Sequence, residues 1–261
     1  MPSRESHRSA ALAAVLVLSS ALAGCTGPAL DVEPEPDPEG LRVLFIGNSL
    51  TEWNELPDMV RWLLQSADVA VGRVESVAVP GTGLEDHWLR GATRTRVDHG
   101  AFDVVVMQQG PSATEGRPSL LEFSERFAEK IRDAGGQPAL YMVWPSTARS
   151  FDFDGVSDSY RTAAEQADGL LFPAGEAWRA AWRRNPELAL YGPDGFHPSE
   201  MGSFLAALVM FEQLSGQDPA TLPPIMRTPT GLEELAPETF ADLAAAASEA
   251  NRDFGRAATA P

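Results

Sequence analysis

Two segments far apart in the sequence carry the polar side chains that a nucleophilic reaction needs. Ser49 follows a short apolar stretch, and Asp194-Gly195-Phe196-His197 lies much later in the chain. A serine hydroxyl is a weak nucleophile, so it needs a base such as His197 and a carboxylate such as Asp194 that orients the base. Each segment also has a structural interpretation, because serine is a common helix N-cap and aspartate a common turn residue.

Ser49 and two further loops carry groups that could donate hydrogen bonds to a substrate oxygen on which negative charge develops. The backbone N–H of Ser49 would lie at a helix N-terminus, where negative charge is favoured. Gly81 lets the backbone approach a substrate closely. Gln109 is the predicted third donor, with Gln108 or Ser112 as substitutes. A plain turn at Gly81 and loop solvation at the glutamines are the alternatives.

The elements that must position these residues alternate between strand and helix. Apolar runs predict strands, and apolar residues at helical spacing predict helices. The predicted strands are 41–46, 74–79, 103–107, 139–144 and 170–172, and the predicted helices are 56–64, 84–97, 120–131, 157–167, 176–184, 201–208 and 240–254. This order predicts a three-layer α/β/α domain with a five-stranded, mainly parallel sheet that is covered on both faces. Ligands bind such sheets at the carboxyl ends of the strands, where the candidate residues lie.

Together these loops resemble the conserved blocks of the SGNH/GDSL hydrolases over about residues 41–214. Gly47-Asn48-Ser49-Leu50 is similar to the first block, with Asn48 where the family usually has aspartate. Gly81 is similar to the glycine of the second block, and the Asp194 and His197 pair resembles the fifth. The third block departs from the family pattern, since Gly110-Pro111-Ser112-Ala113 stands where that family usually has Gly-x-Asn-Asp.

The resemblance implies a flavodoxin-like fold and cleavage of an ester through an acyl-enzyme, with no metal or organic cofactor. In that scheme Ser49 is the nucleophile, His197 the base and Asp194 its orienting acid. The expected substrate is a small acyl or acetyl ester, with carbohydrate as one candidate for the alcohol. The altered third block motivates a second hypothesis, a glycan-binding protein without turnover, and an O-acyltransferase is a third.

The beginning of the chain has the features of an export signal. Arg4 and Arg8 precede an apolar run at 10–23, which is short for a membrane span and suits a secretory signal. The run ends in Leu22-Ala23-Gly24-Cys25, which resembles a bacterial lipobox, and Cys25 is the chain's one cysteine. We therefore expect a signal peptide at 1–24, a lipidated Cys25 that anchors an exported protein to a membrane of the cell envelope, a Pro- and acid-rich tether at 25–40, and a hydrolase domain at 41–261.

Composition excludes some partners and leaves others open. The formal net charge of −17 argues against nucleic acid, because phosphate binding needs clustered Lys and Arg. The histidines show no metal-ligand spacing. His87, beside the glycine loop, is either a pocket residue or a packed one, and Trp53 and Trp144 either stack on sugar rings or fill the core. The sequence does not specify an oligomeric state.

Overall fold

The computed structural model describes residues 39–256 of the 261-residue chain. Its main sheet has five strands in the order β2-β1-β3-β4-β5, and all of the neighbouring pairs are parallel. The strands are β1 (Leu41–Gly47), β2 (Val71–Ala78), β3 (Val104–Met107), β4 (Gln137–Tyr141) and β5 (Leu170–Phe172). The predicted signal peptide, the predicted lipidation site Cys25 and nearly all of the predicted tether lie outside the described residues.

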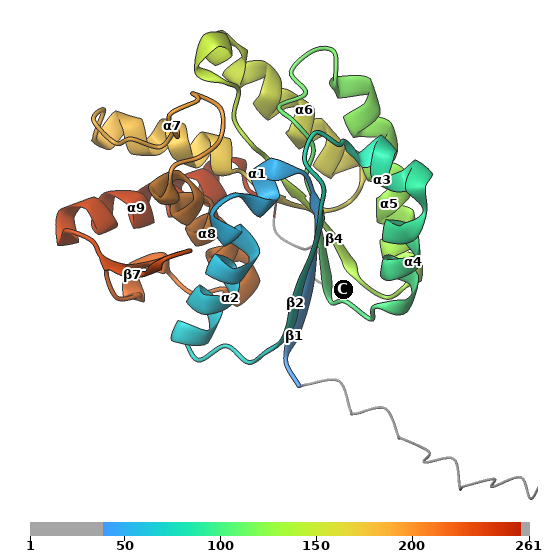
Figure 1. Cartoon of the computed structure of the whole chain (residues 1–261), viewed down its shortest axis with the longest axis horizontal. Helices are drawn as coiled ribbons and strands as arrows, with labels where there is room; N and C mark the ends of the chain where they lie inside the picture. Colours follow the sequence, from blue (N-terminus) through green and yellow to red (C-terminus); the bar gives the residue numbers. More distant parts are fainter. Residues whose placement is uncertain (1–38, 257–261) are drawn as a thin grey trace, which may run out of the picture. The chain divides into compact units, whose positions relative to one another are not determined.

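Helices cover both faces of this sheet, as Figure 1 shows. One face carries α3 (Leu84–Arg90), α4 (Ala92–His99), α5 (Arg117–Asp133) and α6 (Phe153–Gln166). The other face carries α2 (Leu56–Ser66), α7 (Ala174–Arg184), α8 (Glu200–Ser215) and α9 (Pro237–Phe254). The predicted three-layer α/β/α fold is therefore confirmed.

The core lies between the sheet and these two helix layers. Residues Val43 to Ile46 of β1 are fully buried, and β3 and β4 are buried along nearly their whole length. Buried on both faces, the strands read as continuous apolar runs, which explains why the sequence predicted them. None of the helices in residues 39–256 is long and apolar enough to cross a membrane.

Short elements at the carboxyl ends of the strands complete the fold. After β1 come α1 (Ser49–Glu52) and the 3₁₀ turn η1 (Trp53–Glu55), and after β4 comes η2 (Thr147–Asp152). The α1 label in Figure 1 marks this rim of the sheet. It is the rim at which the sequence placed the candidate residues.

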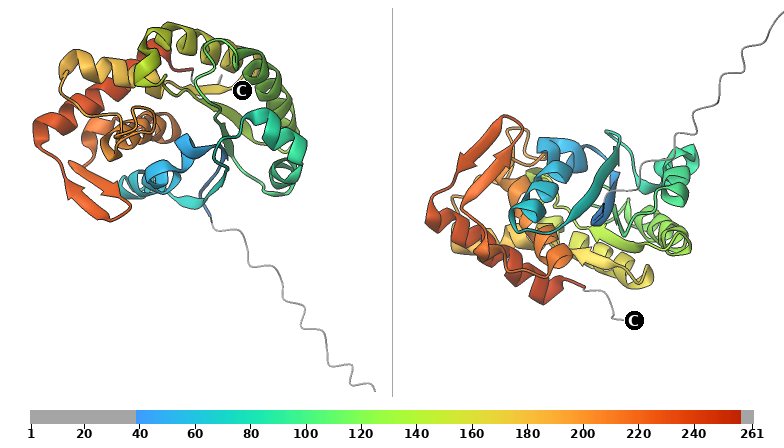
Figure 2. Two further views of the ribbon diagram at one scale, coloured as in Figure 1. Left: turned by 45° about the horizontal axis from the view of Figure 1, so that its top comes forward. Right: turned by 90° about the horizontal axis from the view of Figure 1, so that it is seen from below.

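Two features of the fold differ from the prediction. The predicted helix 84–97 is two helices, because Gly91 takes a left-handed φ of 80° between α3 and α4. A hairpin of β6 (Ile225–Thr228) and β7 (Gly231–Glu234) follows the 3₁₀ turn η3 (Pro219–Thr221) and was not predicted. The hairpin forms a separate two-stranded sheet and packs β6 on α2 and α8 (Figure 2).

Candidate active site

Ser49 is placed at the rim by the end of a buried strand. β1 ends at Gly47, and Asn48 caps the following helix, since its side-chain oxygen accepts a hydrogen bond from the Leu50 N–H at 3.0 Å. Ser49 is therefore the first residue of α1, immediately beyond the sheet. This strand-to-helix turn holds the hydroxyl at the carboxyl ends of the strands.

The structure brings Ser49, His197 and Asp194 into one hydrogen-bonded chain. His197 Nε2 lies 2.9 Å from Ser49 Oγ, and His197 Nδ1 lies 2.6 Å from Asp194 Oδ2. Because a carboxylate only accepts, Nδ1 carries the proton and Nε2 is free to accept from the serine hydroxyl. This is the geometry in which an imidazole can remove the proton of a serine.

Asp194 also organises the turn that carries His197. Its Oδ1 accepts the backbone N–H groups of Phe196 at 3.0 Å and His197 at 2.9 Å. The hydrogen bond from the His197 side chain, and then the one from Phe196 N–H, lower the pKa of Asp194 to about 2. The Asp194 side chain is half exposed, so solvent screens its charge.

Several backbone N–H groups at this rim have no acceptor among the described residues, and three of them lie where an oxyanion could bind. They belong to Ser49, Gly81 and Gly110, and all three residues line one cavity of about 440 Å³. Gly81 has a left-handed φ of 72° with open space where a side chain would start. Ser49 and Gly81 were predicted as oxyanion donors, whereas Gly110 was not.

The three side chains predicted as the third donor are all engaged in internal hydrogen bonds. Gln109 Nε2 donates to Ser112 Oγ and to Gly116 O, both at 3.0 Å, so both of its amide hydrogens are used. Gln108 Oε1 accepts from Asn48 N–H at 2.9 Å and from Thr51 Oγ at 2.8 Å, and its Nε2 donates to Gln109 O. Ser112 Oγ donates to Gly110 O. In this arrangement these side chains brace the loops around Ser49.

His87 is buried, and its hydrogen bonds also hold the loops around Ser49 in place. It is 2% exposed, and its Nε2 donates to the carbonyl of Gly47 at 2.8 Å, while its Nδ1 accepts from the Thr93 hydroxyl at 3.1 Å. The carbonyl of Gly47 fixes this tautomer because it can only accept. Burial lowers the pKa of His87, which favours the neutral ring. The sequence allowed His87 to be either a pocket residue or a packed residue, and the structure supports the packed residue.

The two tryptophans considered from sequence have different surroundings. Trp144 is fully buried and stacks on Trp178, with ring centroids 3.5 Å apart. Trp53 is 43% exposed and stacks on the His197 ring, with centroids 4.1 Å apart and 19° between the planes. Trp53 also lines a second cavity of about 440 Å³ beside the catalytic candidates, whose other lining residues are Ser49, Glu52, Asn54, Glu55, Pro80, His197 and Pro229.

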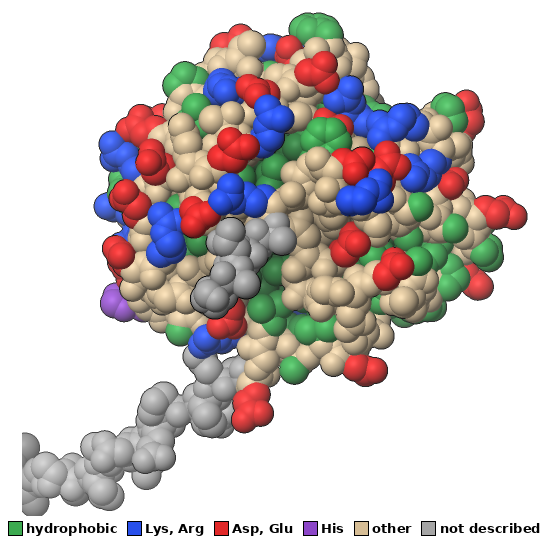
Figure 3. Space-filling view, turned by 180° about the vertical axis from the view of Figure 1, so that it is seen from behind, with side chains coloured by type: hydrophobic (Ala, Val, Ile, Leu, Met, Phe, Trp, Pro, Cys, Tyr) green, Lys and Arg blue, Asp and Glu red, His purple; other side chains and the backbone are tan. Residues whose placement is uncertain are grey.

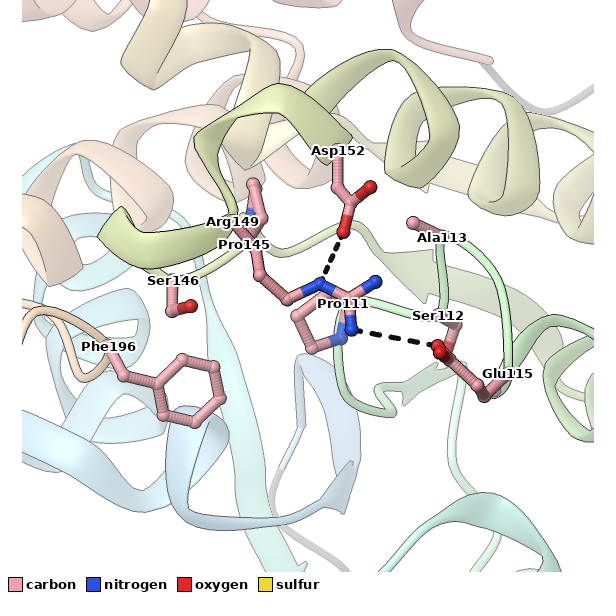
Figure 4. Close-up of a pocket in the computed structure, with 10 residues that line it drawn as sticks. Pro111, Ser112, Ala113, Glu115, Pro145, Ser146, Arg149, Asp152 and Phe196 are labelled. Atoms are coloured by element: carbon pink, nitrogen blue, oxygen red, sulfur yellow. Dashed lines mark hydrogen bonds and ion pairs between the residues drawn. The ribbon is translucent and has the colours of Figure 1, made fainter.

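A third cavity, of about 400 Å³, lies beyond Phe196 and is drawn in Figure 4. Phe196 lines both this cavity and the one that contains Ser49 and Gly81. Arg149 reaches across it, with Nε 2.5 Å from Asp152 and Nη1 3.7 Å from Glu115 on the opposite loop (Figure 4). Its guanidinium is therefore partly neutralised. In residues 39–256, no group of three or more His, Cys, Asp or Glu side chains is placed to hold a metal ion.

Comparison with known proteins gives structural relatives. No family model and no curated protein matches the sequence. A protein from Slackia heliotrinireducens assigned to the SGNH hydrolases is 28% identical with a TM-score of 0.58, covering 68% of this chain and 100% of its own. The fold is that of the SGNH hydrolases.

Two more distant structures share this fold. A DUF4886 family protein from Bacteroides uniformis is 17% identical with a TM-score of 0.67, covering 82% of this chain and 96% of its own. A carbohydrate esterase family 3 protein from Talaromyces cellulolyticus is 16% identical with a TM-score of 0.54, covering 67% of this chain and 96% of its own. The structural neighbours thus include SGNH hydrolases and esterases.

Proposed function

We propose that this protein is a serine esterase that cleaves its substrate through an acyl-enzyme. The observation that supports this most is the chain from Asp194 through His197 to Ser49, with links of 2.6 and 2.9 Å. Ser49 Oγ attacks the ester carbonyl while His197 Nε2 takes its proton, and His197 then passes that proton to the departing alcohol oxygen. Water, activated by His197, attacks the acyl-enzyme and releases the acid and Ser49.

The negative charge on the carbonyl oxygen is stabilised by backbone N–H groups. Ser49 and Gly81 supply two donors, and Gly110 supplies the third in place of a side-chain amide. The proposal draws support from the common cavity of these residues and from their N–H groups, which have no acceptor among the described residues. Donors fixed by the backbone need little reorganisation when the charge develops, which is what makes such sites effective.

The substrate in this proposal is a small acyl ester of a hydroxyl-rich alcohol such as a sugar. The departing alcohol receives its proton from His197 Nε2, so it lies in the cavity that His197 and Trp53 share. An exposed indole with carboxylates nearby suits a sugar ring, which offers C–H groups to the aromatic face and hydroxyls to the acids. One structural neighbour is itself a carbohydrate esterase.

A fluorophosphonate probe tests the nucleophile directly. The intact folded protein is expected to gain one probe adduct at Ser49, and Ser49→Ala is expected to gain none and to hydrolyse no p-nitrophenyl ester. A series of acyl lengths and a set of acetylated glycans then define the substrate. An unlabelled wild type that binds acetylated glycans as tightly as Ser49→Ala does would point instead to a binding protein without turnover.

Acyl transfer uses the same acyl-enzyme and differs only in what attacks it. With a sugar added as acceptor, hydrolysis predicts free acid as the main product. Acylated sugar in excess over free acid would assign the protein to the O-acyltransferases.

We also propose that the protein is exported and lipidated at Cys25. The support is the sequence of residues 1–25 alone. In a bacterial host the full chain is expected in the membrane fraction, with a lipid-modified mature N-terminus by mass spectrometry. Cys25→Ala is expected in the soluble part of the envelope, and membrane retention of this variant would contradict the anchor.

A further inference from the structure

An exposed tryptophan lies flat on the imidazole of the candidate base. The rings of Trp53 and His197 are 4.1 Å apart at their centroids and 19° from parallel. Trp53 is 43% exposed, although tryptophan is a large side chain that contributes most when it is buried. Core packing therefore does not explain why an indole stands at this position.

The imidazole of His197 can swing about its Cβ–Cγ bond, and this swing displaces both ring nitrogens. Hydrogen bonds at Nδ1 to Asp194 and at Nε2 to Ser49 resist the swing. The indole of Trp53 lies flat on one face of the ring, so it blocks the swing toward that side.

Asp194 orients the imidazole from a partly exposed position. Its side chain is 50% exposed, so water competes with Nδ1 for the carboxylate. His197 itself is 20% exposed. Contact with Trp53 adds to the orientation of Nε2 toward Ser49.

The backbone on which Trp53 stands is held against the loop of His197. Asn54 donates from its side-chain amide to the carbonyl of Pro198 at 3.2 Å and to Ser203 Oγ at 2.9 Å. Pro198 directly follows His197, so the amide connects the turn of the indole to the loop of the imidazole. Farther along, Glu55 pairs with Arg227 of β6 at 3.2 Å.

The conformation of this turn is unfavourable without those contacts. Asn54 and Glu55 have left-handed φ angles of 55° and 54°, and two successive residues other than glycine rarely adopt them. Such backbone persists where surrounding contacts determine it, and it is common at functional sites. The turn is thus held in the shape that presents Trp53 to His197.

We propose that Trp53 is a positioning residue for His197 and that Asn54 holds Trp53 in place. This inference rests on the proposed esterase function. Trp53 fixes the plane of the imidazole, and Asn54 fixes the distance between the two loops.

The decisive variant is Trp53→Ala, with Trp53→Phe as the conservative partner. For p-nitrophenyl acetate, kcat of Trp53→Ala is expected to fall by about 10- to 100-fold, the scale on which misplaced catalytic groups slow a reaction, with KM nearly unchanged. Trp53→Phe restores most of kcat because a phenyl ring also covers the imidazole. Fluorophosphonate labelling of Ser49 slows by the same factor as kcat. Phe254→Ala, which removes another partly exposed ring on α9, controls for surface effects and keeps wild-type kinetics.

Asn54→Gly isolates the amide, because glycine accepts the left-handed φ without strain. A smaller loss of kcat in the same direction is expected. The double variant Trp53→Ala, Asn54→Gly is expected to be no slower than Trp53→Ala alone, since both act through one ring. If the losses of kcat in the two single variants add in the double variant, Asn54 does not act through Trp53, and its part of the proposal is wrong.

Other outcomes separate this inference from the proposed function. If wild type and Ser49→Ala are equally inert to the probe, the esterase proposal fails. If wild type is labelled and Trp53→Ala keeps its kcat, the positioning role alone is overturned. A rise in KM confined to acetylated sugars would then assign Trp53 to the binding of the alcohol. Circular dichroism confirms that each variant is folded.

Discussion

The exposed Asp194 distinguishes this site at the scale of single residues. Its carboxylate accepts three hydrogen bonds from one short turn, from the His197 ring and from the N–H groups of Phe196 and His197. These bonds lower its pKa to about 2 although water reaches it. In the proposed mechanism, Asp194 therefore orients His197 without being shielded from water.

Asp194→Asn tests that role. In the variant, the side-chain NH₂ of the asparagine would face Nδ1 of His197. Because this group is a donor, it favours the tautomer in which Nε2 carries the proton, and Nε2 can then no longer accept from Ser49. We expect kcat to fall by roughly 10²- to 10⁴-fold with little change in KM. Because the pKa of Asp194 is about 2, the wild-type carboxylate stays charged above about pH 4, so this acid does not limit activity there. Asp218→Asn, a helix-capping aspartate that accepts from Ala220, is the matched control and should keep wild-type kcat.

His87 gives a second residue-scale prediction, for stability. Burial lowers its pKa below the usual 6.5, so the unfolded chain binds a proton at a pH at which the folded protein does not. The stabilisation is fully present above pH 6.5 and is lost as pH falls below it, with a slope of up to about 1.4 kcal/mol per pH unit. Urea unfolding between pH 7.5 and 5 measures this slope, and His87→Asn should flatten it.

The exposed His99, at the end of α4, provides the control. His99→Asn should keep the wild-type slope. A slope that survives in His87→Asn and disappears in His99→Asn would contradict the assignment to the buried ring.

At the scale of elements, Gly81 and Gly135 form a natural pair for comparison. Both have left-handed φ angles, 72° and 83°, and both have open space where a side chain would start. Alanine at either position should cost about 1–2 kcal/mol of unfolding free energy from the backbone alone. Gly81 lines the cavity of Ser49, whereas Gly135 lies in the turn between α5 and β4.

Gly81→Ala is therefore expected to lower kcat/KM about 10- to 100-fold, because the strained loop moves its N–H and a methyl enters the cavity. Gly135→Ala should be equally destabilised in urea and fully active per folded molecule. Equal activity of the two variants would show that the Gly81 loop does not contact the reacting group.

Four of the five parallel strands, β1, β3, β4 and β5, were predictable from sequence because they are largely buried, whereas the edge strand β2 is only partly buried. Their order also placed Ser49, Gly81 and Gln109 at one rim, since parallel strands end together. The β6–β7 hairpin was missed because its strands are four residues each and β7 is exposed along its length. The other strands were predicted from apolar runs, and neither β6 nor β7 is such a run.

The stack of Trp53 on His197 was not predictable for a different reason. It depends on a turn in which Asn54 and Glu55 are left-handed, and no glycine marks such a turn in the sequence. Likewise, the internal hydrogen bonds of Gln109 depend on Leu84, Ser112 and Gly116, which come together only in the folded chain. Tertiary contacts, rather than local pattern, set these parts of the site.

At the scale of the whole molecule, acidic residues outnumber basic ones by a wide margin. The chain has 37 Asp and Glu against 20 Lys and Arg, which gives the formal net charge of −17. On the face seen in Figure 3, basic side chains lie among acidic ones. Most ion pairs of the described residues are partly exposed, as in Arg161 with Asp158 and Arg179 with Asp154. Exposed pairs of this kind contribute little each, about 0–1 kcal/mol.

Repulsion among the unpaired acids should therefore dominate the response of the full chain to salt. Raising NaCl from about 10 to 150 mM shortens the screening length from about 30 to 8 Å, which weakens repulsion between distant carboxylates more than attraction within touching pairs. We expect Tm at pH 7 to rise by a few degrees over this range. At about pH 4.5, where carboxylates begin to protonate and the net charge shrinks, the rise should be much smaller. Differential scanning calorimetry at both pH values measures the effect, with sucrose at matched osmolality as the uncharged control. A fall of Tm with salt at pH 7 would contradict this prediction. It would mean that attraction within the ion pairs stabilises the folded protein by more than repulsion among the acidic residues destabilises it.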